Sequence, residues 1–298
     1  MISTKYLHPD VIARAQALGL KARTIVEGLR VGDHKSPFRG FSVEFVQHRE
    51  YVPGDDIKHI DWKSYGRSER YTIKQYEQET NFTGHILLDA SRSMLYGDGA
   101  QNKLEYAKVL TAALAYLIVN QRDSVGLNIF DQTWRNVLPP SSQTSHILTI
   151  LHTLESLEPQ DKTSMGPLIH DIAQRVTRRG LVFVISDCFD DVGALLSGLQ
   201  HLRFQGHEVT VFHIMHADEI GFPFDGTVKF DGMEENLHLL TRPQLIRPAY
   251  LRAVKKYLSE LQTGCENNRC DYVFMNTSRP LAVTLTEYLA RRLRVRVV

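Results

Sequence analysis

The sequence predicts an α/β protein built on a doubly wound, mostly parallel sheet, with an N-terminal helical and small β segment before it. From residue 85 onward, short continuous apolar runs alternate with helical patterns, which is typical of parallel strands buried on both faces. Hydrophobic residues make up 43% and charged residues 23% of the chain, so a sizeable core is expected. Residues 35–82 are instead rich in Gly, Asp, Arg and aromatic residues. We therefore predict an N-terminal segment at 1–81 and the sheet domain at 82–298.

The N-terminal segment divides into two parts. Between residues 10 and 31, apolar residues recur at helical spacing and are interrupted by Gly19, which predicts one or two helices. Residues 41–46 and 71–76 alternate between apolar and polar, as half-buried strands do. With a turn at Pro53-Gly54-Asp55, they predict a small antiparallel β layer.

The sheet domain is predicted in chain order from its apolar runs and amphipathic stretches. Strands are expected at 86–89, 125–130, 181–185, 209–215 and 271–275. Helices are expected at 103–120, 145–157, 165–177, 192–204, 243–262 and 281–293. After His216 a turn-rich segment through Pro223, Gly226 and Gly232 predicts a hairpin.

Charge and cysteine content restrict the classes of partner and compartment. Lys and Arg (35) nearly cancel Asp and Glu (34), so the overall field that attracts nucleic acid or anionic membranes is absent. The cysteines Cys188, Cys265 and Cys270 are an odd, sparse set, expected as buried thiols in a reducing compartment. The first ten residues do not resemble a signal peptide, and no apolar run approaches the roughly 18 residues of a transmembrane segment. We expect a cytoplasmic protein that binds no nucleic acid.

Oxygen-bearing side chains follow two of the predicted strands. The first sheet strand ends in Asp89-Ala90-Ser91-Arg92-Ser93 and a later one ends before Asp187, while Thr163 precedes a helix. Ligands of doubly wound sheets bind at the carboxyl ends of the strands. Mg²⁺ prefers such oxygen ligands, and Mn²⁺ or Ca²⁺ would also accept them. Asp and Ser also populate turns and helix caps, but their order and placement favour a divalent metal site formed by Asp89, Ser91, Ser93, Thr163 and Asp187.

The sequence lacks the motifs of nucleotide-binding proteins, of zinc sites and of serine hydrolases. Neither a phosphate loop nor a Gly-x-Gly-x-x-Gly fingerprint is present, so nucleotide binding is not expected. His213 and His216 would point to opposite faces of a strand, which is unsuited to joint zinc coordination. Ser91 and Ser93 lack the Gly-x-Ser-x-Gly turn of hydrolases.

The Asp-x-Ser-x-Ser, Thr, Asp set resembles the metal-ion-dependent adhesion site of the von Willebrand factor A domain. That resemblance implies that the metal keeps one position open for a carboxylate of a protein partner. The sequence departs from the family in one place, since Asp161-Lys162 precede Thr163 where the family usually has glycines.

A second resemblance rests on residues 40–79. This stretch contains Gly40-Phe-Ser-Val-Glu44, Arg49 to Asp56, Ile60-Asp61-Trp62, Arg67 and Lys74-Gln-Tyr76. It is similar to the bacterial family called domain of unknown function 58, which joins this signature to a von Willebrand factor A-like domain. The resemblance implies an adaptor for a MoxR-type AAA+ ATPase.

Alternatives remain for the signature itself. Asp55, Asp56, His59 and Asp61 are candidates for a second metal site or for the acid and base of a metal-dependent hydrolase. Interleaved Arg and Lys residues favour ion pairs instead. A single-stranded nucleic acid surface is a third reading, against which the adjacent acids argue. The expectation is a non-enzymatic, metal-dependent protein-binding module.

Overall fold

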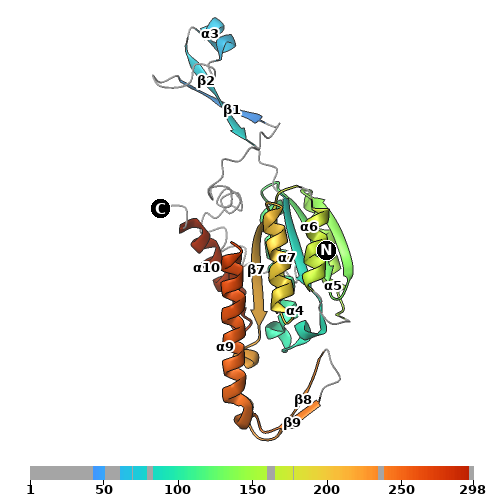
Figure 1. Ribbon diagram of the computed structural model, residues 1–298. Coiled ribbons are helices and arrows are strands. Elements are labelled where there is room, and N and C mark those ends of the chain that lie inside the picture. Colours follow the sequence, from blue (N-terminus) through green and yellow to red (C-terminus); the bar gives the residue numbers. More distant parts are fainter. Residues whose placement is uncertain are drawn as a thin grey trace. The chain divides into compact units, whose positions relative to one another are not determined.

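A computed structural model describes residues 43–50, 61–68, 70–78, 83–159, 165–176, 178–233 and 238–294 (Figure 1). Residues 43–78 of this set belong to one compact unit, and residues 83–294 belong to another. The helices predicted within 10–31 and the turn at Pro53-Gly54-Asp55 lie outside the described residues.

The smaller unit contains an antiparallel strand pair, as the alternation predicted. Strands β1 (Val43–Glu50) and β2 (Thr72–Gln78) pair with one irregularity in register between Phe45 and Gln47. A helix that was not predicted, α3 (Trp62–Ser68), lies between them in the chain. Its short length leaves too little periodicity to recognise.

The larger unit is built on a six-stranded sheet with the order β10-β7-β6-β3-β4-β5. The strands are β3 (Thr83–Asp89), β4 (Ser124–Phe130), β5 (Trp134–Ser141), β6 (Leu181–Ser186), β7 (Glu208–Met215) and β10 (Asp271–Asn276). All neighbours pair in parallel except β4 and β5. Numbered along the chain, this is the 3-2-1-4-5-6 order of doubly wound sheets, whose strand order reverses between β3 and β6. The predicted fold class is confirmed.

Strand β5 was missed because it contains Pro139 and Pro140. Proline cannot donate a hydrogen bond within a sheet, so it occurs in edge strands and at bulges. Both conditions hold here, because β5 is the edge strand and its pairing with β4 is irregular at two places.

Two helical layers cover the sheet, because successive side chains of a strand point to opposite faces. Ile86 and Leu88 join one core, whereas Leu87 joins the other. The first core includes side chains of α4 (Lys103–Val119), α5 (Thr144–Glu155) and α10 (Leu281–Arg294). The second includes side chains of α6 (Met165–Arg175), α7 (Val192–Phe204) and α9 (Pro243–Asn267).

The remaining elements follow β7. A five-residue helix that was not predicted, α8 (Ala217–Gly221), precedes the predicted hairpin, formed by β8 (Val228–Asp231) and β9 (His238–Thr241). The three cysteines are buried free thiols, as expected. Within the described ranges, no helix combines the length and apolar character needed to cross a membrane.

The close approach of α6 and α7 depends on Gly166. A Cβ atom added there would lie 2.8 Å from the Ala194 Cβ and 3.0 Å from its carbonyl carbon. Alanine normally stabilises a helix by up to about 1 kcal/mol over glycine, but overpacking costs about 1–3 kcal/mol. We therefore expect Gly166→Ala to lower the free energy of unfolding by about 1 kcal/mol in urea denaturation. Gly221→Ala, which meets no atom within 4 Å, is the control; equal or greater stability of Gly166→Ala would contradict the packing described.

Candidate functional site

The loop after β3 turns its polar side chains toward one another. Ser91 N donates to Asp89 Oδ1 at 2.9 Å, which closes a local turn directly after the strand. A 3₁₀ turn, η2 (Arg92–Leu95), follows, and the fully buried Met94 anchors it in the core. As a result the Ser91 and Ser93 hydroxyl oxygens lie 3.0 Å apart.

Asp89 is fully buried at the carboxyl end of β3. Its Oδ2 accepts a hydrogen bond from Ser186 Oγ at 2.5 Å. The parallel register explains this contact, because Leu88 pairs with Ile185 and the next residue of each strand follows at the same edge. The contact links the ends of β3 and β6 at the position where strand order reverses.

The segment after β6 is held in an unusual backbone conformation. Asp187 is fully buried and Cys188 has a φ of 55°, a left-handed value uncommon for a residue other than glycine. Cys188 N donates to Ser186 Oγ at 2.8 Å, and Tyr257 OH donates to the Cys188 carbonyl oxygen. Asp190 Oδ2 then accepts from Met165 N at 2.6 Å, at the start of α6. This segment therefore fixes Asp187 and also positions a neighbouring helix.

A buried lysine lies beside Asp187. Lys103, the first residue of α4, has no exposed side-chain surface, and its Nζ lies 2.8 Å from Asp187 Oδ2 and 2.7 Å from Glu219 Oε1. A cation is disfavoured at a helix N-terminus and in an apolar interior. Burial pulls the pKa of Lys103 down, but the charges of Asp187 and Glu219 more than offset this, so the pKa lies above its ordinary value. The ammonium group therefore stays charged.

Glu219 reaches this lysine from the end of a third strand. It lies in α8, which follows β7, and its Oε2 accepts from His216 N at 2.7 Å within a capping box. His216 also contacts the Tyr96 ring, whose centroid lies 5.1 Å away. The ends of β3, β6 and β7 thus contribute to one polar cluster, which consists of Asp89, Ser91, Ser93, Lys103, Ser186, Asp187 and Glu219 and which we call the switch-point site.

Negative charge exceeds positive charge in the switch-point site. Burial, together with the nearby Asp187 charge, raises the pKa of Asp89 to about 7. When ionised, Asp89, Asp187 and Glu219 carry three negative charges and Lys103 carries one positive charge, which leaves a formal charge of −2. A divalent cation beside Asp89 would balance that charge and favour its ionised form. The donor set thus fits a hard divalent cation.

The oxygen donors still have capacity for a metal. Each oxygen of a carboxylate has two lone pairs, so Asp89 can accept its hydrogen bonds and also ligate a cation. Across the ranges that the structure describes, no three His, Cys, Asp or Glu side chains form a metal-binding group. A metal at the switch-point site would therefore depend on the Ser91 and Ser93 hydroxyls as well as on carboxylates.

Four of the five predicted ligands lie at this edge of the sheet, namely Asp89, Ser91, Ser93 and Asp187. Thr163 lies outside the described residues. Lys103, Ser186 and Glu219 were not predicted as parts of the site. The one sequence signal for Lys103 was a lysine at the first position of a helix, where its charge opposes the helix dipole.

The acidic residues of the signature are only partly described. Asp55, Asp56 and His59 lie outside the described residues. Asp61 is buried, and its Oδ1 accepts from Ser64 N at 3.2 Å, the contact of a residue that caps the N-terminus of α3. Asp61 therefore has a structural role as the cap of α3.

A family model described as "Protein of unknown function DUF58" matches residues 47–259. The chain belongs to the DUF58 family. Uncharacterized protein Rv1480 of Mycobacterium tuberculosis is 21% identical over 290 residues, which cover 96% of this chain and 91% of that protein. This assignment agrees with the resemblance to the same family that residues 40–79 indicated.

Solved structures of similar proteins include two with a modest likeness. BatB from Bacteroides thetaiotaomicron is 19% identical with a TM-score of 0.47, covering 72% of this chain and 99% of that one. The VWA domain of SpRpn10 is 15% identical with a TM-score of 0.41, covering 69% and 94%. The fold of this DUF58 protein rests on its own strand order and connections.

The buried ion pair gives a direct prediction about stability. Lys103→Met leaves the Asp187 carboxylate buried without its cation, and breaking such a pair typically costs about 3–5 kcal/mol. We expect a loss of about 3 kcal/mol in the free energy of unfolding, measured by urea denaturation. Lys256→Met removes an exposed pair with Glu260 on α9 and should cost less than about 1 kcal/mol. Similar losses in the two variants would show that Lys103 is not a buried counter-ion.

Proposed function

We propose that the protein is a non-enzymatic binding module that holds a protein partner through a divalent metal, Mg²⁺ first of all, at the switch-point site. One observation carries the proposal: the buried Asp89 carboxylate and the Ser91–Ser93 hydroxyl pair share one loop beside Asp187. These residues stand in the order of the metal-ion-dependent adhesion site of von Willebrand factor A domains.

Electrostatics support a cation at this position. A carboxylate in a fully buried environment is costly unless a positive charge or several hydrogen bonds compensate it. Asp89 accepts hydrogen bonds from Ser91 N and Ser186 Oγ, yet its pKa remains raised to about 7, mainly by burial. A bound cation would remove this cost, so metal binding and the burial of Asp89 are compatible.

The roles of the two aspartates differ in this proposal. Asp187 Oδ2 already accepts from Lys103 Nζ, and Asp187 Oδ1 accepts from Phe189 N at 3.3 Å. Asp89, Ser91 and Ser93 would therefore be the direct protein ligands, and Asp187 would act through a water molecule. Thr163 is the remaining proposed ligand. A site with one direct carboxylate and several neutral oxygens leaves a position for an acidic residue of the partner.

An enzymatic role is not proposed. The hydrolase alternative depends on Asp55, Asp56 and Asp61 acting together, and Asp61 caps α3.

The proposed partner is a MoxR-type AAA+ ATPase that presents an acidic side chain, and this assignment rests on the family resemblance.

The metal proposal predicts a difference between Asp89 variants in calorimetry. Wild-type protein should bind Mg²⁺ or Mn²⁺, and Asp89→Asn should bind at least about tenfold more weakly, because a neutral amide replaces the one direct anionic ligand. Asp225→Asn, at an exposed aspartate outside the site, should bind as wild type does.

Circular dichroism of Asp89→Asn is the folding control. A folded variant that binds as tightly as wild type, or a wild type that binds neither metal, would refute the metal assignment.

The partner proposal predicts metal-dependent capture. Immobilised wild-type protein should retain a purified MoxR-type ATPase in buffer with Mg²⁺, and both EDTA and Asp89→Asn should abolish retention. The Asp225→Asn protein should retain the ATPase normally. Equal retention with Mg²⁺ and with EDTA would exclude a metal-bridged contact, and no retention by wild type would exclude this partner.

A further inference from the structure

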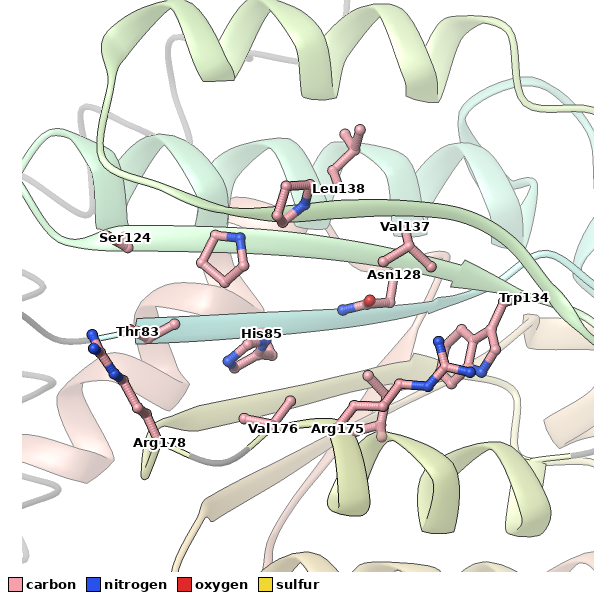
Figure 2. Close-up of a pocket in the computed structure, with 13 residues that line it drawn as sticks. Thr83, His85, Ser124, Asn128, Trp134, Val137, Leu138, Arg175, Val176 and Arg178 are labelled. Carbon is pink, nitrogen blue, oxygen red and sulfur yellow. The ribbon is translucent and has the colours of Figure 1, made fainter.

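A pocket of about 420 Å³ lies beside the edge strand of the sheet (Figure 2). Its floor contains His85 of β3 and Asn128 of β4, and one wall is formed by β5. The opposite wall is formed by the end of α6 and the residues that follow it, including Arg175, Val176 and Arg178. The volume falls in the range of about 300–1,000 Å³ that small-molecule sites occupy.

This pocket is separate from the switch-point site. Thr83 and Ser124, the first residues of β3 and β4, line it, whereas Asp89 is the last residue of β3. The pocket therefore lies toward the amino ends of these strands, and the switch-point site lies at the carboxyl ends.

Two buried polar side chains face the pocket without a protein partner. Asn128 is 4% exposed and His85 is 7% exposed. Figure 2 shows both side chains directed into the space between β5 and the end of α6. Among the described residues, neither side chain makes a hydrogen bond to protein. No polar atom of either side chain is among the fully buried, unpartnered atoms of the described residues, so both groups face the pocket and can bond to water or to a ligand there.

His85 acts here as a neutral hydrogen-bonding group. Burial, with a smaller effect of the charge on His207, lowers the pKa of His85 to about 4. Its imidazole therefore offers one donor and one acceptor near neutral pH. The Asn128 amide adds donors and an acceptor beside it.

The charged residues at the pocket are cationic. Arg175 and Arg178 line it, and no Asp or Glu is among the described lining residues. The nearby Asp171 is already engaged, because it accepts from Trp134 Nε1 at 2.6 Å and pairs with Arg175 Nε at 2.8 Å. Arg178 is exposed and, in the part of the chain that the structure describes, forms no ion pair. Arginine is well suited to bind carboxylate or phosphate groups.

The remaining walls are mainly apolar. Figure 2 shows the Trp134 ring at the pocket, and Pro139 and Pro140 of β5 also line it. A flat apolar body can pack against such surfaces, while the polar groups fix its orientation.

We propose that this pocket binds a small organic anion with a flat apolar body, an acid group and a second hydrogen-bonding group. Figure 2 shows Arg175 beside Trp134 and Arg178 at the other end of the pocket. The acid group pairs with Arg175, the body packs on Trp134, and the second group bonds to Asn128 and His85. This ligand site goes beyond the proposed metal-dependent function and does not depend on it.

The test uses the indole signals of the full-length protein in ¹H–¹⁵N spectra. The chain has two tryptophans, so Trp134 reports on the pocket and Trp62 in the smaller unit is an internal control. The probe is 4-hydroxybenzoate, which carries all three features of the proposed ligand. A molecule of this size is expected to bind with a Kd of about 1 mM. It should shift the Trp134 signal saturably and leave Trp62 unchanged.

Matched probes and variants separate the proposed contacts. The neutral 4-hydroxybenzamide should bind at least about tenfold more weakly, as should 4-hydroxybenzoate to Arg175→Ala. Arg252→Ala, at an exposed arginine of α9, should leave binding unchanged. No saturable Trp134 shift up to about ten times the expected Kd, or equal binding of acid and amide, would overturn the proposal.

A second measurement tests whether Asn128 serves a ligand or the fold. Asn128→Leu replaces an unpartnered buried amide by an apolar group of similar size, so the melting temperature should stay the same or rise. Binding of 4-hydroxybenzoate should weaken in the same variant. A clear fall in melting temperature would show that the amide has a structural role and would overturn its assignment to a ligand. Neither result depends on metal binding at Asp89.

Discussion

The structure depends on the burial of two carboxylates, Asp89 and Asp187, at the point where the order of the sheet reverses. Parallel pairing of β3 and β6 places the ends of both strands at one edge, and Ser186 joins them by bonding to Asp89. The burial of two negative charges near each other is unfavourable. Lys103 compensates Asp187, with Glu219 as its second partner, and this ion pair ties α4 and α8 to the sheet edge. The excess negative charge beside Asp89 remains as the basis for a divalent cation.

Much of this fold could be predicted because its signals are local and strong. Continuous apolar strands and amphipathic helices alternate along residues 83–294, and the rules for parallel connections then restrict the topology. Elements without such signals were missed. Strand β5 carries Pro139 and Pro140 and exists because β4 offers a free edge, whereas α3 and α8 are too short for periodicity and depend on caps by Asp61 and His216.

The candidate site was predictable only where its residues follow strand ends. Asp89, Ser91, Ser93 and Asp187 occupy positions that the doubly wound topology brings to one edge. Lys103 and Glu219 interact across 116 residues of sequence, and no local pattern relates them. The same reasoning explains why the pocket at the opposite strand ends was not foreseen. His85 and Asn128 stand within apolar strands, and their lack of protein partners is visible only in three dimensions.

The central claim is that a divalent cation binds at the end of β3. Crystals of the protein grown with Mn²⁺, with diffraction measured at an energy where manganese scatters anomalously, test it most directly. We predict one anomalous peak within about 2.0–2.4 Å of oxygens of Asp89, Ser91 and Ser93, with Lys103 still paired to Asp187. Ordered density for the three side chains with no anomalous peak, or a peak only at other residues, would contradict the account.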